Sequence, residues 1–150
     1  MRALIIDGQG QHDWKATTPI LKKHLEDTAL FAVDGATSPP QGADMSGFSP
    51  KFADYKVIVS NYDGDEWSDA TKKAFVDYML AGGGLVVVHA AGNSFSRWPE
   101  WNQMIGLSGA RIPEEGPPHA YLIDLLDESH PITIGLPKQW LHAPDELSFR

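Results

Sequence analysis

The segment GGGLVVVHAAGN, residues 82–93, constrains the fold of this chain more than any other feature. Its glycines are typical of a helix end, and the apolar residues after them indicate a short strand that is buried on both faces. The strand ends at His89, where a turn follows. Ligands of open α/β sheets bind at the carboxyl ends of parallel strands. His89 is therefore the first candidate for a functional side chain.

Three other apolar runs bounded by turn residues complete a regular series. The four predicted strands cover residues 3–6, 30–33, 57–59 and 85–88. Helical patterns over 18–27 and 68–81 lie between two pairs of them, with Thr17 and Ser68 as the expected N-caps. This alternation predicts an α/β fold with a mainly parallel sheet and helices on its faces. At 150 residues, the chain fits a single domain, 1–150.

The remaining segments are less regular. Residues 37–50 are rich in Pro, Gly and Ser, which predicts a surface loop. Beyond residue 93 we expect a short helix at 98–105, a loop at 111–118, a strand at 121–126, and a turn with an extended segment over 130–140. The chain stops directly after a motif-like segment, so we expect it to be C-terminally truncated.

Composition excludes several classes of function. The net charge is −8 and the basic residues are scattered, which argues against nucleic acid and membrane surfaces as partners. There is no cysteine, so thiolate metal sites and a Cys nucleophile are excluded. No apolar run approaches the length of a signal or membrane segment, and we expect a cytoplasmic protein.

Histidines supply most of the candidate chemistry, because imidazole is a common metal ligand and a general base suited to neutral pH. His24 lies on a helical stripe and is predicted to be a half-buried packing residue, and His130, before a proline, is predicted to fix a turn. Four others lie near strand ends or loops: His12, His89, His119 and His142.

His12 and Asp13 follow the first strand through the loop DGQGQHDW. We expect this loop at the same sheet edge as His89 and next to the strand that bears it, so that both histidines face one cleft. The alternative is a helix-entry turn in which Asp13 accepts backbone N–H groups. The glycines lack the spacing of a dinucleotide-binding loop.

Asn61 follows the third strand and falls on the same edge, where its amide could bind a sugar hydroxyl or orient a water molecule. Asp63, Asp65 and Glu66 come just before the second helix, and we expect them to favour its N-terminus.

The turn after His89 has the shape of a nucleophile elbow, but its central residue is Ala90. Alanine cannot attack a carbonyl, which excludes acyl transfer through a covalent intermediate there. Farther along, His142 stands three and four residues before Asp145 and Glu146. These three could form a base with its orienting carboxylate or hold a cation, or they form a polar turn in which Asp145 caps a following helix.

Six ordered segments together resemble the trehalose-utilisation, or ThuA-like, family: GQGQHDWKATTPIL, NYDGDEW, GGGLVVVHAAGNSF, WNQMIGL, SHPITIGLP and LHAPDEL. The resemblance implies a flavodoxin-like three-layer α/β/α sandwich, related to class I glutamine amidotransferases but without their catalytic cysteine. Ala90 agrees with that loss. It also implies carbohydrate catabolism, acting on trehalose, related disaccharides or their 3-keto derivatives. Domains of the family usually continue beyond the segment LHAPDEL.

Our hypothesis is acid–base or metal-assisted chemistry on a small carbohydrate, with no glutamine amidotransferase activity. The proposed catalytic residues are His89, His12, His142 and Glu146. The family's other recurrent polar residues and one tryptophan are proposed to bind substrate: Asp13, Trp14, Asn61, Asn93, His119 and Asp145. Trp67, Phe95 and Trp98 could join Trp14 in a platform for the sugar ring.

Two questions stay open at this stage. The cofactor is unknown; a divalent zinc, manganese or nickel ion held by His12, His89 and His142 is one option. The alternative function is a non-catalytic sugar-binding or protein-interaction module, and a homo-oligomer is a further option.

Overall fold

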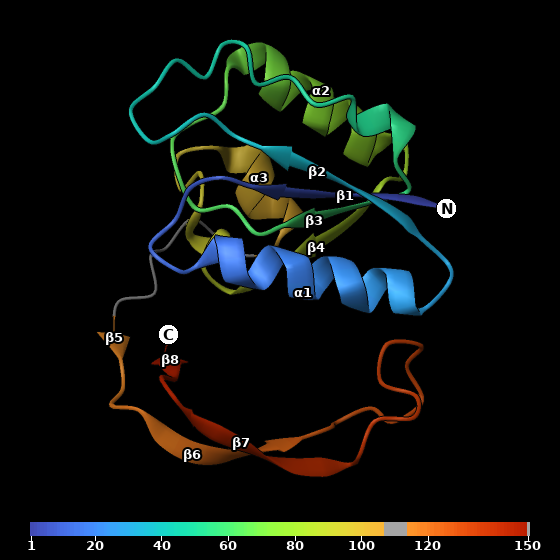
Figure 1. Cartoon of the computed structure of the whole chain (residues 1–150). Helices are drawn as coiled ribbons and strands as arrows, with labels where there is room; N and C mark the ends of the chain where they lie inside the picture. Colours follow the sequence, from blue (N-terminus) through green and yellow to red (C-terminus); the bar gives the residue numbers. More distant parts are fainter. Residues whose placement is uncertain (107–113, 150) are drawn as a thin grey trace. The chain divides into compact units, whose positions relative to one another are not determined.

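The computed structural model describes residues 1–106 and 114–149 (Figure 1). The chain divides into two compact units, Met1–Gly109 and Ala110–Arg150, called here the N-terminal and C-terminal units. No helix in the described part of the chain is long and apolar enough to cross a membrane.

A four-stranded parallel sheet forms the centre of the N-terminal unit. Its strands are β1 (Arg2–Asp7), β2 (Ala32–Thr37), β3 (Val57–Ser60) and β4 (Gly84–Val87), in the order β2-β1-β3-β4. The α/β class is therefore as predicted. β2 starts two residues later than expected, since Leu30 is exposed and pairing with β1 begins at Ala32.

The helices follow the sequence pattern with one shifted boundary. α1 (Trp14–Asp27) begins four residues before the predicted start, because the side chain of Asp13, rather than Thr17, caps it by accepting from the Ala16 N–H. α2 (Asp69–Leu80) has the predicted cap, Ser68, and stops before Gly82, whose φ of 86° is in the left-handed region. α3 (Pro99–Met104) matches the predicted short helix. There are also two described 3₁₀ turns: η1 (Phe52–Asp54) precedes β3, and η2 (His89–Asn93) follows β4.

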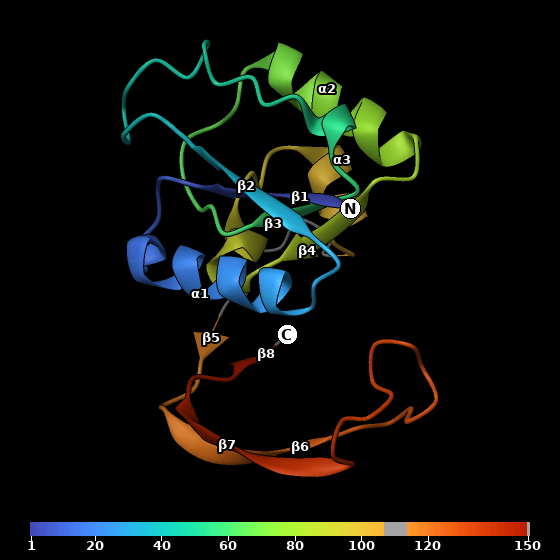
Figure 2. The same cartoon turned by 45° about the vertical axis from the view of Figure 1, so that its right-hand side comes forward.

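The two faces of the sheet carry separate cores, one under α1 and one under α2 and α3 (Figures 1 and 2). The α1 side is aliphatic, with Leu21 and Leu25 against the strands. The other side is built from packed aromatic rings: Phe52, Tyr62, Trp67, Phe75, Tyr78, Phe95, Trp98 and Trp101. Two predictions fail here. The loop 37–50 sends Met45 and Phe48 into this core, and His24 is exposed rather than half-buried.

Antiparallel strands make up the described C-terminal unit. β6 (His119–Asp124) pairs with β7 (Gln139–Asp145), and β5 (Glu114–Glu115) pairs with β8 (Ser148–Phe149). The predicted strand and turn are thus present, with β6 beginning two residues early. Of the predicted loop 111–118, residues 111–113 lie outside the described residues and β5 occupies two others. His130 fixes its turn as expected, since its Nδ1 accepts from the Ile132 N–H.

Candidate functional site

A pocket of about 270 Å³ lies at the carboxyl edge of the parallel sheet, where the sequence predicts a site. The loops after β1, β3 and β4 surround it. They contribute Gln9, Gly10, His12, Asn61, Tyr62, Asp63, Val88, His89, Ala90 and Ala91, and α1 adds Trp14 and Thr17.

His12 and His89 touch in this pocket. Their ring centroids are 4.5 Å apart and the ring planes make an angle of 72°, an edge-to-face contact. The strands that carry them are not neighbours, contrary to our expectation, because β3 lies between β1 and β4. The loop after β1 reaches across β3. The two histidines therefore share one cleft, as predicted, by way of this loop.

His89 occupies a backbone conformation that costs free energy. Its φ of 45° lies in the left-handed region, which non-glycine residues seldom adopt. The sharp change of direction from β4 into η2 occurs at this residue, with Ala90 immediately after it. Such strain persists where surrounding structure enforces it, and it is concentrated at functional sites.

Asn61 is anchored on α1. Its Nδ2 donates to the Oγ1 atoms of Thr17 and Thr18, at 2.9 and 3.1 Å. The amide therefore points its oxygen, an acceptor, toward other groups. Trp14, the first residue of α1, is half-buried beside it in the pocket wall.

Gln9, which sequence reasoning missed, fastens the loops of the site. It is buried, its Nε2 donates to the Pro39 carbonyl at 2.7 Å, and its Oε1 accepts from the Asp65 N–H at 2.8 Å. A Cβ on Gly64 would collide with this side chain. Gln9 thus joins the loops that follow β1, β2 and β3.

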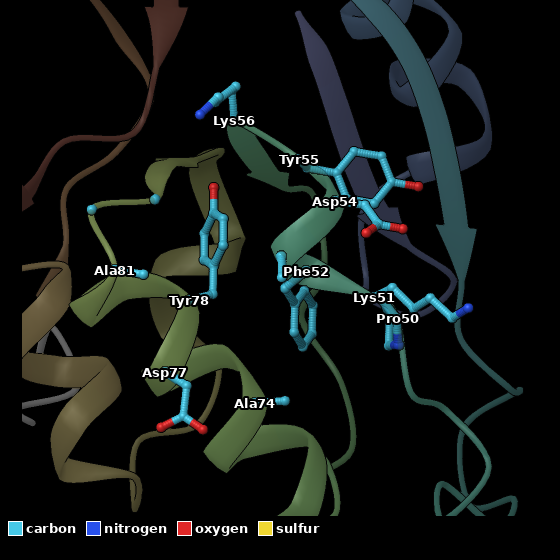
Figure 3. Close-up of a pocket in the computed structure, with 13 residues that line it drawn as sticks. Pro50, Lys51, Phe52, Asp54, Tyr55, Lys56, Ala74, Asp77, Tyr78 and Ala81 are labelled. Atoms are coloured by element: carbon cyan, nitrogen blue, oxygen red, sulfur yellow. The ribbon is translucent and has the colours of Figure 1, made fainter.

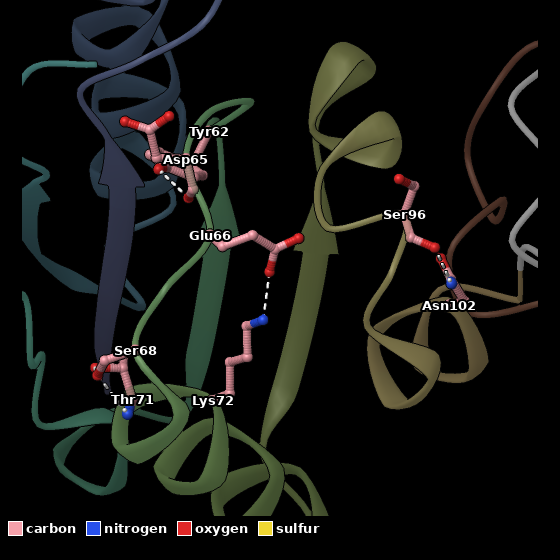
Figure 4. A network of polar contacts seen from close by, with 8 residues as sticks. All are labelled: Tyr62, Asp65, Glu66, Ser68, Thr71, Lys72, Ser96 and Asn102. Atoms are coloured by element: carbon pink, nitrogen blue, oxygen red, sulfur yellow. Dashed lines mark hydrogen bonds and ion pairs between the residues drawn. The ribbon is translucent and has the colours of Figure 1, made fainter. Parts of the chain in front are cut away.

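The acidic segment after β3 contacts neighbouring loops and, through Glu66, the first turns of α2 (Figure 4). Its expected stabilisation of the N-terminus of α2 stays a prediction. Asp63 accepts from the Ser94 hydroxyl, Asp65 accepts from the Gly42 N–H, and Glu66 pairs with Lys72. The Tyr62 hydroxyl donates to the Asp65 carbonyl at 2.6 Å, and burial raises the pKa of this phenol. Tyr62 and Asp63 line the pocket, so their hydrogen bonds hold two residues of its wall.

Three of the four aromatic residues suggested for a sugar platform are core residues instead. Trp67, Phe95 and Trp98 are buried in the aromatic core, and of the four only Trp14 is among the described residues that line the pocket. Asn93 is exposed at the end of η2 and is not among the described residues that line the pocket.

The remaining candidates lie in the C-terminal unit. His142 on β7 stacks on Tyr121 of β6 at 4.8 Å and its Nδ1 donates to the Ala143 carbonyl. The Nδ1 of His119 donates to the Pro117 carbonyl. Asp145 is part of β7 and accepts from the Glu146 N–H, so it caps no helix. The functional roles of His119, His142, Asp145 and Glu146 stay predictions.

The described residues contain no group of three or more His, Asp or Glu side chains arranged to hold a metal ion. Within the N-terminal unit, His12 and His89 supply two imidazoles, whereas protein zinc sites use three or four protein ligands. The three-histidine metal site stays a prediction.

A larger pocket of about 600 Å³ lies at the opposite, amino edge of the sheet (Figure 3). Lys56 and Gly83, which directly precede β3 and β4, line it together with Phe52 and Tyr78. Its described lining includes no histidine. Both chemistry and topology therefore favour the smaller pocket.

Comparison with known proteins gives a consistent result. The model of the ThuA family, described as trehalose utilisation, matches residues 2–149 and so spans both units. A ThuA-like protein from Parabacteroides merdae is 37% identical with a TM-score of 0.89, over 98% of this chain and 62% of that one. A ThuA-like protein from Bacteroides uniformis is 26% identical with a TM-score of 0.73, over 99% of this chain and 60% of that one. No curated protein matches.

Proposed function

This chain belongs to the ThuA, or trehalose-utilisation, family, and we propose that it acts in carbohydrate catabolism through the pocket that holds His12 and His89. The substrate class is trehalose, a related disaccharide or a 3-keto derivative of one. The contact between the two imidazoles at the ligand-binding edge of the sheet is the observation that carries the proposal.

General acid–base catalysis suits these groups. One imidazole accepts a proton from the sugar while its neighbour donates one to the oxygen that gains charge, and His89 is the proposed base. Trp14 offers an aromatic face for the apolar side of a pyranose ring. The amide oxygen of Asn61 accepts from a sugar hydroxyl, since its nitrogen is held by α1.

The volume of the pocket limits how much of a substrate it takes. At about 270 Å³ it is near the lower end of ligand pockets, which start at roughly 300 Å³. It therefore suits one sugar ring rather than a whole disaccharide. The chain spans 62% and 60% of the two ThuA-like relatives, and the second ring is proposed to bind outside this pocket.

Turnover of trehalose and of its 3-keto derivative, followed by NMR, tests the proposal. His89→Ala and His12→Ala should each lower kcat/KM at least about a hundredfold, the usual contribution of a positioned acid or base. His24→Ala, which changes an exposed histidine of α1, is the control and should keep full activity. Equal activity in all three variants would contradict the proposed site.

A non-catalytic sugar-binding module is the second candidate, favoured by a pocket in which Trp14 and Asn61 can contact a sugar ring without any chemical step. It predicts sugar binding by calorimetry with no turnover in the wild type. Elemental analysis of the wild type and a His12→Ala/His89→Ala double variant decides the metal option. Stoichiometric zinc, manganese or nickel that the double variant loses would support metal-assisted chemistry.

A further inference from the structure

Asn61 is held both at its backbone and at the end of its side chain. Its backbone N–H donates to the Ile6 carbonyl at 2.9 Å, which extends the pairing of β3 with β1 by one residue. Its Nδ2 donates to the hydroxyls of Thr17 and Thr18. Consecutive residues of an α-helix point roughly 100° apart, so the nitrogen lies between two hydroxyls and each of its protons has an acceptor. Both donors of the amide are therefore in use.

The hydroxyl of Thr17 determines which way the Asn61 amide faces. This hydroxyl donates to the carbonyls of Asp13 and Trp14, at 3.3 and 3.4 Å. Because its single proton is directed at α1, its oxygen can only accept from Asn61. An amide turned by a half-rotation would place its own oxygen against the Thr17 oxygen, acceptor against acceptor. The amide nitrogen therefore faces α1, and the amide oxygen faces away from it.

The amide oxygen is the polar atom that Asn61 can offer to a ligand. Asn61 lines the pocket that contains His12 and His89, and no described residue donates to its Oδ1. An amide oxygen binds a group that carries a proton, such as a hydroxyl, whereas it repels a carbonyl oxygen, which is itself an acceptor. This side chain can therefore distinguish a hydroxyl from a ketone at one carbon of a sugar ring.

We propose that Thr17 and Thr18 are positioning residues that make Asn61 selective for a hydroxyl group. The pocket then prefers a sugar ring with a hydroxyl beside Asn61 over a ring with a hydrogen or a keto oxygen at that carbon. A keto sugar binds with its keto oxygen away from Asn61. The orientation of the amide rests on the structure alone, and the selection among sugars rests also on the proposed function.

Turnover of trehalose and of its monodeoxy analogues, each of which lacks one hydroxyl, tests the selection. The measured quantity is the ratio of kcat/KM for trehalose to kcat/KM for each analogue. Asn61→Leu identifies the analogue that concerns Asn61, because only its ratio should fall, from about ten in the wild type to about one. A ketone at the same carbon should make a poorer substrate than the deoxy sugar, since two acceptors then face each other.

The threonines are tested with the same ratio. In Thr17→Val/Thr18→Val the amide is free to turn, so the ratio identified with Asn61→Leu should fall toward one and the other ratios should stay unchanged. Thr17→Ser/Thr18→Ser keeps both hydroxyls and should keep every ratio. A purely structural loss lowers kcat/KM for all sugars alike and leaves the ratios as they are. A wild-type ratio in the double valine variant would contradict the positioning role.

NMR of the chain without sugar tests the orientation separately. Both side-chain amide protons of Asn61 should exchange with water at least about tenfold more slowly than those of the exposed Asn93. The double valine variant should lose this difference and the double serine variant should keep it. Equal exchange at Asn61 and Asn93 in the wild type would contradict the proposed orientation. Protected amide protons in a protein that turns over none of the sugars would contradict the proposed function and the selection, but not the orientation.

Discussion

The two units of this chain treat apolar side chains in opposite ways. The N-terminal unit holds every buried hydrophobic residue of the described chain, around a core of stacked and edge-to-face rings. The described C-terminal unit is mostly a two-stranded hairpin, and six large apolar side chains are exposed on it: Leu122, Leu126, Ile132, Ile134, Leu136 and Leu141. A hairpin of two strands is marginally stable by itself in water. The first unit therefore holds side chains with a packed core of its own, whereas none of the buried hydrophobic residues of the described chain lies in the second.

The candidate site residues differ in the same way. His12 and Asn61 lie on loops that Gln9 joins, His89 lies in the turn after β4, and the three meet in one pocket. His142 is held by a ring stack on a neighbouring strand, and Asp145 by a contact with the next residue. The proposed chemistry accordingly relies on the N-terminal residues.

The largest expected effect is on the free energy of unfolding, and it distinguishes the packed N-terminal unit from the C-terminal hairpin. Phe75 is fully buried and contacts five other rings, so Phe75→Ala should lower the free energy of unfolding of the N-terminal unit by about 3–5 kcal/mol. Leu141→Ala, at a side chain 68% exposed, should change stability by less than about 0.5 kcal/mol. Urea unfolding with hydrogen exchange measured in each unit checks both. A comparable loss in Leu141→Ala would show that the hairpin has a core of its own.

Substitutions at two glutamines compare a buried polar contact of the N-terminal unit with an exposed one of the C-terminal unit. Gln9→Leu removes the hydrogen bonds to the Pro39 carbonyl and the Asp65 N–H and leaves that N–H without its acceptor, at a cost of about 2 kcal/mol. Gln139→Leu removes a bond to Asp124 that is exposed to water and should cost only a few tenths of a kcal/mol. We also expect Gln9→Leu to disturb the contact between His12 and His89, visible as changed imidazole NMR shifts. Unchanged shifts would show that Gln9 does not position the site.

Alkaline pH should weaken the N-terminal unit through Tyr62. Burial raises the pKa of its phenol above the ordinary value, so the folded state favours the neutral form. The stabilisation is complete below about pH 10, the pKa in the unfolded chain, and is lost as the pH rises beyond it. Tyr62→Phe should cost about 1 kcal/mol at pH 7, by loss of the bond to the Asp65 carbonyl, and should show a weaker alkaline decline. An equally steep decline in the variant would assign it to other groups.

Sequence patterns predicted those parts of the fold that depend on neighbouring residues. Buried parallel strands are continuous apolar runs, so β1, β3 and β4 are visible in the sequence, and Ser68 with Gly82 marks both ends of α2. β2 is a more polar strand at the sheet edge, and its start was misplaced.

Contacts between distant residues were beyond such patterns. Gln9 is a polar residue between two glycines, typical of an exposed loop, and its partners are 30 and 56 positions away. Trp67 and Trp98 lie next to predicted site loops, yet both are buried in the aromatic core. The meeting of His12 and His89 was predicted from topology, but the loop that crosses β3 to bring it about was not.

Glycine substitutions at two histidines give the smallest effects and should differ in sign. His89→Gly removes a side chain from a left-handed backbone position, which glycine adopts without strain, so stability should rise by about 0.5–1 kcal/mol. His142→Gly places glycine inside β7 and loses the stack on Tyr121, so stability should fall by about the same amount. Thermal unfolding measures both. A more stable His89→Gly protein without turnover would show that the chain tolerates strain at this residue in order to place an imidazole, whereas a less stable one would mean that His89 packing outweighs its strain.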